Sequence, residues 1–123
     1  MGRILVADDE PQMRKLIELS LKKAGLEMIP AVDGHDAIAK AVAERPDVII
    51  LDVTMPGMNG FQALTELKSR EPTAAIPVIV LTSKGREIAR QEAESLGAAS
   101  FINKPFSPRI LAEEIARLIT GSP

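Results

Sequence analysis

Short runs of apolar residues alternate along the chain with longer stretches in which apolar residues recur every three or four positions. The run Val48–Leu51 contains no polar position, which suits a strand buried on both faces of a parallel sheet. Pro56 cannot continue a central strand, so this strand is expected to end near Asp52. The strands predicted from the pattern cover residues 4–7, 26–29, 48–51, 78–81 and 100–103.

The five intervening stretches have the spacing of amphipathic helices. The first helix is expected to begin near Pro11, a favourable first helical residue, and to stop at Gly25. Glu71–Thr73, which contains a proline, is expected to end the third helix. The fourth helix, which stops at Gly97, has a weaker and more polar stripe than the others. The helical stripes span residues 13–24, 37–42, 61–67, 88–96 and 111–119.

The alternation of strands and helices indicates one α/β domain. Right-handed crossovers between successive strands produce a parallel sheet with helices on both faces. The predicted fold is doubly wound and flavodoxin-like, with five strands in the order 2-1-3-4-5 and five helices. The domain is expected to span residues 1–119, which leaves 120–123 as a tail or the start of a linker.

Composition and charge narrow the function without identifying it. Hydrophobic residues make up 46% of the chain and the net charge is -2, which argues against disorder and against a general attraction to nucleic acid. There is no cysteine, and the single histidine, His35, suits a solvated loop or cap. No apolar run approaches the roughly 20 residues of a membrane span, and the N-terminus lacks a signal-peptide core. We therefore expect a soluble cytoplasmic protein that binds neither nucleic acid nor a membrane.

Reactive side chains are concentrated where the predicted strands end. Asp8 and Asp9 follow the first strand, Asp52 and Thr82 follow the third and fourth, and Lys104 follows the fifth. In the predicted order the first and third strands are neighbours about 4.8 Å apart, so the three acids converge at the topological switch point. Carboxylates at such a short separation repel one another until a proton or a cation relieves the repulsion. Hard oxygen ligands at an open, partly hydrated site favour Mg²⁺.

These residues resemble a known set of motifs. The paired acids, the segment Leu51–Gly60, Thr82-Ser83 and Lys104-Pro105-Phe106 are similar to the receiver domain of two-component response regulators of the chemotaxis-regulator kind. The similarity covers essentially the whole chain. It implies a signalling switch that accepts a phosphoryl group from a histidine kinase or a phosphotransfer protein in a Mg²⁺-dependent reaction. It does not imply an enzyme that acts on a separate substrate.

The resemblance also implies a role for each site residue. Asp52 is the expected phosphoacceptor, and Lys104 is expected to pair with the phosphoryl oxygens. The expected ligands of Mg²⁺, or of Mn²⁺ as an alternative ion, are Asp9, Asp52, the backbone carbonyl of Thr54 and, through a water, Asp8. Thr82 and Phe101 are the expected switch residues. Their movement is expected to change the surface made by the fourth predicted helix, the fifth strand and the last helix.

Partners and modulating positions follow from the same resemblance. The residues expected near the docking site of the phosphoryl donor are Gln12, Met13, Pro105 and Phe106. A downstream protein or output domain is expected to read the changed surface, with the chain as a monomer or a weak phosphorylation-dependent dimer. Thr54 and Lys84 occupy positions at which the family varies its dephosphorylation rate. The Lys104–Pro105 peptide bond matches the family's cis bond.

Each site residue has a simpler explanation when it is considered alone. Asp8 and Asp9 could only cap the first helix, and Thr82 could only cap the fourth. Lys104 could be a solvated loop lysine and Phe101 a core residue. Asp52 is harder to explain in this way, because a carboxylate that ends an aliphatic strand loses solvation. The combination of these residues at one edge of a sheet favours a single site.

Three other function classes share parts of the pattern. A phosphorylation-independent adaptor has no need to retain the acids, threonine and lysine. A phosphatase with an aspartate nucleophile needs a second acid two residues after the nucleophile, where this chain has Thr54. A flavin-binding protein needs hydroxyls and glycines in its first loop, where this chain has Asp8, Asp9 and Glu10. The phosphorylation switch is therefore the leading hypothesis.

Overall fold

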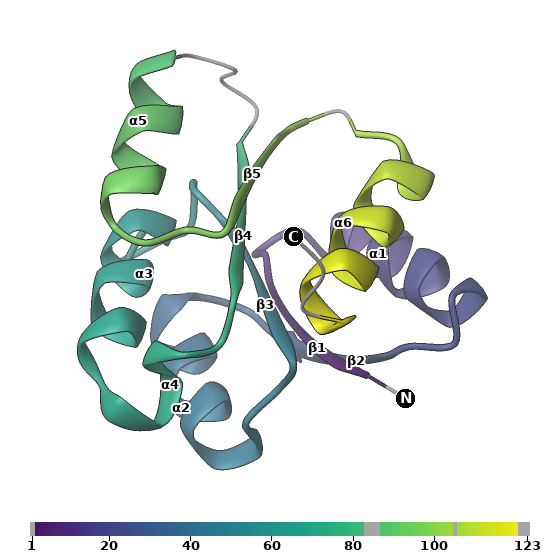
Figure 1. Ribbon diagram of the computed structural model, residues 1–123, viewed down its shortest axis with the longest axis horizontal. Helices are drawn as coiled ribbons and strands as arrows, with labels where there is room; N and C mark the ends of the chain where they lie inside the picture. The colour runs from purple at the N-terminus through teal and green to yellow at the C-terminus, as the bar shows by residue number, and fades with distance from the viewer. Residues whose placement is uncertain (1, 83–86, 105, 121–123) are drawn as a thin grey trace.

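A five-stranded parallel sheet forms the centre of the computed structural model, which describes residues 2–82, 87–104 and 106–120 (Figure 1). The strands are β1 (Arg3–Ala7), β2 (Glu27–Ala31), β3 (Val48–Asp52), β4 (Val78–Thr82) and β5 (Ser100–Asn103). Their order is β2-β1-β3-β4-β5, as the sequence predicted. Because β1 lies beside β3, the carboxyl ends of these two strands meet at the switch point.

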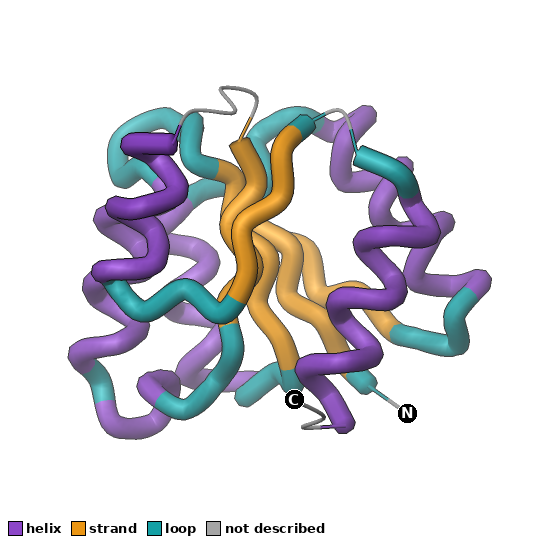
Figure 2. The backbone as a smooth tube through the Cα atoms, turned by 45° about the horizontal axis from the view of Figure 1, so that its top comes forward, coloured by secondary structure: helices purple, strands orange, loops and turns teal. Residues whose placement is uncertain are grey.

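Helices cover both faces of the sheet (Figures 1 and 2). They are α1 (Pro11–Lys23), α2 (Gly34–Glu44), α3 (Gly60–Ser69), α4 (Glu71–Ala74), α5 (Glu87–Ser95) and α6 (Pro108–Thr120). Helices α1 and α6 lie on one face, whereas α2, α3 and α5 lie on the other. The doubly wound architecture is therefore confirmed.

Each face of the sheet has its own buried core, since successive strand side chains point to opposite faces. In β3, Ile49 and Leu51 join the core under α2, α3 and α5, whereas Val48 and Ile50 join the core under α1 and α6. Every residue of β3 is buried. The run Val48–Leu51 is therefore the two-faced central strand that its composition predicted.

The described residues contain six helices, and the prediction of five was wrong at one position. The segment Glu71–Thr73 does not merely end the third helix, because α3 has already ended at Ser69 and α4 begins at Glu71. Proline breaks a helix interior but fits the first turn, where its missing N–H is not needed. The buried Thr73 hydroxyl donates to the Leu67 carbonyl at 2.6 Å, which ties α4 to α3.

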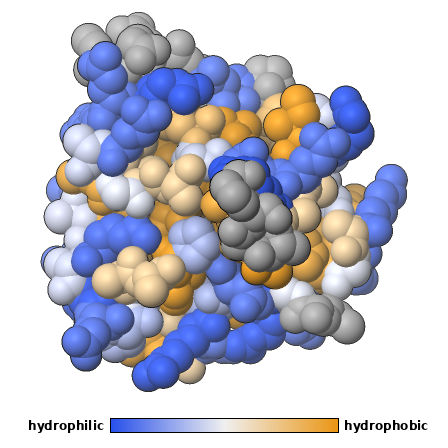
Figure 3. Space-filling model, in the orientation of Figure 1, coloured by the Kyte–Doolittle hydropathy of each residue, from blue (hydrophilic) through white to orange (hydrophobic). Residues whose placement is uncertain are grey.

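The outer surface is mixed in character. Figure 3 shows hydrophilic side chains over much of the face seen in Figure 1, with hydrophobic ones between them. His35 is exposed in the first turn of α2, as expected for a residue near a helix cap. Within residues 2–82, 87–104 and 106–120, no helix has both the length and the apolarity needed to cross a membrane.

Candidate functional site

The acid pair that follows β1 divides into a buried and an exposed residue. Asp8 has no exposed surface, whereas Asp9 is exposed. The Asp8 N–H donates to the Ala31 carbonyl at 3.2 Å, and Asp8 Oδ1 accepts the Glu10 N–H at 2.9 Å. Asp8 therefore supports the turn that precedes α1, but no side chain caps the first turn of this helix, so the capping explanation does not account for Asp8. Its second oxygen is left to the site.

Asp52 is the last residue of β3 and is 5% exposed. The backbone beyond it is held by the first residue of α3, Gly60, whose N–H donates to the Val53 carbonyl at 2.9 Å. A Cβ on Gly60 would lie 2.4 Å from the Asp52 carbonyl oxygen, so a side chain does not fit there. The close approach of α3 therefore fixes the strand end that carries Asp52.

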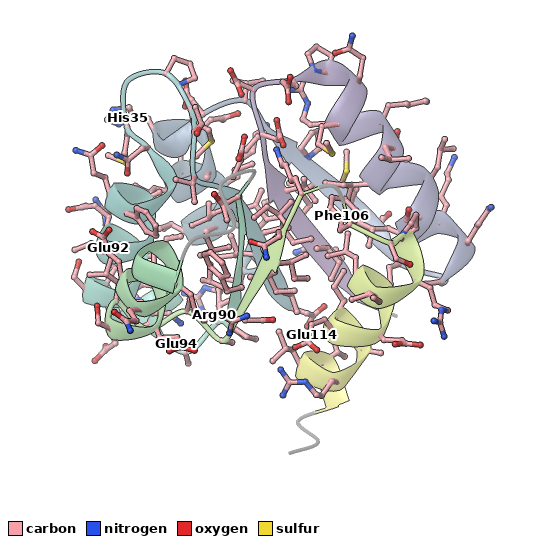
Figure 4. The ribbon with its side chains drawn as sticks, turned by 90° about the horizontal axis from the view of Figure 1, so that it is seen from above. His35, Arg90, Glu92, Glu94, Phe106 and Glu114 are labelled. Carbon is pink, nitrogen blue, oxygen red and sulfur yellow. The ribbon has the colours of Figure 1, made fainter. Side chains whose placement is uncertain are left out.

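The three acids come together as predicted. Carboxylate oxygens of Asp8, Asp9 and Asp52, one from each residue, all lie within 4.8 Å of one another. Figure 4 views the molecule from this end of the sheet. Oxygen donors at this spacing suit a small divalent cation such as Mg²⁺.

Lys104 reaches the buried acids from the end of β5. Its Nζ lies 3.1 Å from Asp8 Oδ2 and 3.3 Å from Asp52 Oδ1, and its side chain is 12% exposed. Its backbone N–H donates to the Thr82 carbonyl at 2.6 Å, which continues the pairing of β4 and β5 beyond the strand. These contacts exclude the explanation of Lys104 as a solvated loop residue. One ammonium group facing three acids leaves an excess of negative charge when the acids are ionised.

The protonation equilibria reflect this crowding. Burial raises the pKa of Asp52, and the neighbouring Asp8 carboxylate raises it further, while Lys104 and the Thr54 N–H oppose the shift. Burial alone would lower the pKa of Lys104, but the charges of Asp52 and Asp8 prevail and hold this pKa above its usual value. Lys104 therefore stays protonated beside Asp52. Because the pKa of Asp52 is raised, any added positive charge would stabilise its ionised form.

Thr82 and Thr54 lie on the segments that adjoin Asp52. Thr82 ends β4, the neighbour of β3, and is 3% exposed. The Thr54 N–H donates to Asp52 Oδ1 at 3.4 Å, whereas the Thr54 side chain is exposed. A phosphoryl contact for Thr82 and a metal contact for the Thr54 carbonyl stay predictions. Lys84 and Pro105, with the peptide bond that precedes Pro105, lie outside the described residues.

Phe101 is neither fully buried nor free. Its half-buried ring packs against the core under α2, α3 and α5. The guanidinium carbon of Arg90, from α5, lies over the ring, 5.4 Å from its centroid. The core explanation therefore accounts for part of the environment of Phe101, and its switch role stays a prediction.

Arg14 is a residue at the site that the sequence alone did not single out. Its Nη1 donates to the backbone carbonyl of Asp8 at 2.6 Å. It lies one turn into α1, at the helix end where the dipole disfavours cations, and the first turn of α1 has no acidic residue. A cation near the start of a helix, shortly after a pair of acids, was the feature of the sequence that could have pointed to Arg14.

Comparison with known families identifies this arrangement. The family model of the response regulator receiver domain matches residues 4–116. The chain belongs to this family. The resemblance noted from the motifs is therefore confirmed, and receiver domains are signalling modules rather than enzymes with a separate substrate.

Individual relatives agree with this assignment. The chain is 37% identical over 121 residues to Protein PilH of Pseudomonas aeruginosa, an alignment that covers 98% of this chain and 100% of PilH. It is 42% identical over 115 residues to the phosphate regulon transcriptional regulatory protein PhoB of the same organism, covering 94% of this chain but 49% of PhoB. The chain thus spans about half the length of that regulator.

A solved structure supports the same fold. The chemotaxis protein CheY4 of Vibrio cholerae superposes with a TM-score of 0.90 at 35% sequence identity, over 96% of this receiver and 98% of CheY4. Both PilH and CheY4 match nearly end to end, so the receiver unit can be compared with them as a whole.

Proposed function

We propose that this receiver is a phosphorylation-activated switch whose phosphoacceptor is Asp52. The observation that supports this most directly is the contact of Lys104 with both buried acids, Asp8 and Asp52, at the carboxyl edge of the sheet. A buried carboxylate can act as a nucleophile, and an adjacent ammonium group can stabilise the negative charge of the incoming phosphoryl oxygens.

The proposed reaction transfers a phosphoryl group from a histidine kinase or a phosphotransfer protein. A carboxylate oxygen of Asp52 attacks phosphorus, and the P–N bond of the donor phosphohistidine breaks as the new O–P bond forms. The donor nitrogen keeps the electron pair of the broken bond. Lys104 then pairs with the phosphoryl oxygens instead of the Asp52 carboxylate alone.

We propose that Asp9 and Asp52 hold a divalent ion directly, with the Thr54 carbonyl, and that Asp8 acts through a water. Asp8 favours the indirect role because its two oxygens already accept from Glu10 and Lys104, whereas Asp9 is exposed and accessible. An all-oxygen donor set with excess negative charge fits Mg²⁺, with Mn²⁺ as an alternative. When bound, the ion would neutralise charge on the acids and on the phosphoryl group.

The response is proposed to pass through Thr82 and Phe101 to the surface of α5, β5 and α6. The hydroxyl of Thr82 would bond the new phosphoryl group, and the ring of Phe101 would turn inward. A downstream protein or an output domain would bind the changed surface. The added negative charge supplies the bias between the two states of this surface.

The donor is proposed to dock beside the site, on α1 at Gln12 and Met13 and near Phe106. Gln12 is exposed, and Met13 and Phe106 are half buried. A groove of about 460 Å³ lies further along α1, between α1 and α6. Leu16 and Leu19 line it and are 45% and 50% exposed, which suits the apolar face of a partner helix.

Intact-mass measurement after treatment with acetyl phosphate tests the chemistry. The chain should gain about 80 Da, the mass of one phosphoryl group, when Mg²⁺ is present. The gain should disappear with a chelator and in the Asp52→Asn variant, while Asp36→Asn, at an acid outside the cluster of Asp8, Asp9 and Asp52, should keep it. The absence of a gain under every condition would support the phosphorylation-independent adaptor instead.

A further inference from the structure

Every polar group of Asp8 is engaged by a different part of the molecule. Its N–H donates to Ala31 of β2, and its two carboxylate oxygens accept from the Glu10 N–H and from Lys104 Nζ. Its backbone carbonyl accepts from Arg14 at 2.6 Å. The other groups that hold Asp8 act on its N–H or its side chain. Arg14 alone among these contacts holds the carbonyl of the peptide that joins Asp8 to Asp9.

The position of Arg14 is unusual for a cation near three acids. Its guanidinium donates to a backbone carbonyl, although a guanidinium usually prefers a carboxylate. The residue is half buried in the first turns of α1. The guanidinium of this half-buried arginine is therefore used to orient one peptide group.

We propose that Arg14 is a positioning residue for the divalent-ion site. By holding the Asp8 carbonyl, it fixes the Asp8–Asp9 peptide and so directs the exposed Asp9 carboxylate toward Asp52. This inference rests on the proposed function, because it assumes that Asp9 and Asp52 bind the ion. It adds a residue that contacts neither the ion nor the phosphoryl group.

The direction in which the Mg²⁺ affinity changes when Arg14 is replaced distinguishes a positioning role from a simple electrostatic effect. A positive charge near the site repels Mg²⁺, so loss of that charge alone would tighten Mg²⁺ binding. Loss of a group that orients a ligand weakens metal binding, by roughly 10-fold to 100-fold for residues that support ligands in other metal sites. A purely structural role would lower thermal stability and leave the Mg²⁺ affinity unchanged.

Isothermal titration of the whole chain with Mg²⁺ tests the proposal. Arg14→Gln should raise the dissociation constant about 10-fold. Arg14→Lys, which keeps the charge and one donor, should fall between Arg14→Gln and the wild type. The matched control is Lys15→Gln, which removes a positive charge from the next position of α1. Lys15 is exposed and pairs with Glu18, so this variant should bind Mg²⁺ within about 2-fold of the wild type.

The outcomes are distinct. Mg²⁺ binding by Arg14→Gln that equals or exceeds that of the wild type would overturn the positioning role. If Arg14→Gln shows no cooperative unfolding transition, Arg14→Lys decides the matter, and an affinity equal to that of the wild type would then overturn it. A wild type that binds no Mg²⁺ would overturn the metal part of the proposed function together with this inference.

Discussion

The acid site at the sheet's carboxyl edge and the region around Phe101 in β5 hold their side chains to different degrees. On the side of β1 and β3, Asp8 and Asp52 are almost inaccessible, and hydrogen bonds fix every polar group of Asp8. On the side of β5, Phe101 is half buried, and its described cationic neighbour is the exposed Arg90.

The helices beside the two regions differ in the same way. On the acid side, α1 buries Ile17 and Leu21, and α3 buries Ala63, Leu64 and Leu67 and begins with a capping box. Among the α5 side chains that the structure describes, only Ala93 is buried. Elements with few buried contacts open at low cost. The proposed division of labour fits this contrast for residues 90–95 of α5, with the chemistry where the acids are buried and the response where the described helix residues are more exposed.

The rigidity of the acid side can be broken at Gly60. Gly60→Ala should destabilise the fold by about 3 kcal/mol, because the new Cβ would overlap the Asp52 carbonyl and push β3 and α3 apart. Urea unfolding followed by circular dichroism measures this loss.

Gly57→Ala is the matched control for the same loop. Gly57 has a φ of +74°, and a Cβ added to it would have no neighbouring atom within 4 Å, so alanine there meets backbone strain and no clash. Its cost should be about 1 kcal/mol. A loss for Gly60→Ala no greater than that for Gly57→Ala would mean that α3 does not hold the end of β3.

The charge on the acid side gives the second prediction. Since the fold raises the pKa of Asp52, the native state binds this proton more tightly than the unfolded chain does. Stability therefore falls as the pH rises from the usual carboxyl pKa of 3.8 through the raised value. With a chelator present, Asp52→Asn should be more stable than the wild type at pH 7, and this advantage should vanish below about pH 3.8.

Thermal melts between pH 3 and pH 8 measure this difference. Asp36→Asn is the control, because Asp36 lies on α2, outside the cluster of Asp8, Asp9 and Asp52, and pairs with Lys40. An Asp52→Asn variant that is less stable than the wild type at pH 7 would show that the contact with Lys104 outweighs burial and repulsion from Asp8.

Much of this edge could be predicted because its causes are local or topological. The aliphatic run ending at Asp52 marks a two-faced strand, and right-handed crossovers then bring Asp8, Asp9 and Asp52 together without any knowledge of side-chain contacts. Helix α4 was missed because Pro72 has the same local signature whether it stops one helix or starts another.

The remaining contacts depend on distances that a sequence does not contain. Arg14 could have faced solvent or a carboxylate, and its choice of the Asp8 carbonyl depends on the angle between β1 and α1. The close approach of Gly60 to Asp52 likewise depends on how α3 returns to the sheet. The covering of Phe101 by Arg90 depends on the position of α5 relative to β5.

The region around Phe101 provides the prediction with the smallest effect. Arg90→Gln removes the cation above Phe101 and should cost about 0.5 kcal/mol, the scale of an exposed cation–π contact. The chain has three phenylalanines, so labelling with 4-fluorophenylalanine gives three ¹⁹F resonances, and Phe101→Leu identifies the one from Phe101. That resonance should shift and narrow in Arg90→Gln, because the ring loses a contact that restricts its motion. Arg109→Gln, which breaks an exposed pair with Glu113 on α6, should leave the Phe101 resonance in place.

A Phe101 resonance unchanged by Arg90→Gln would mean that the core under α2, α3 and α5 holds the ring by itself. The acid site and the region around Phe101 would then be more alike in rigidity than their burial indicates.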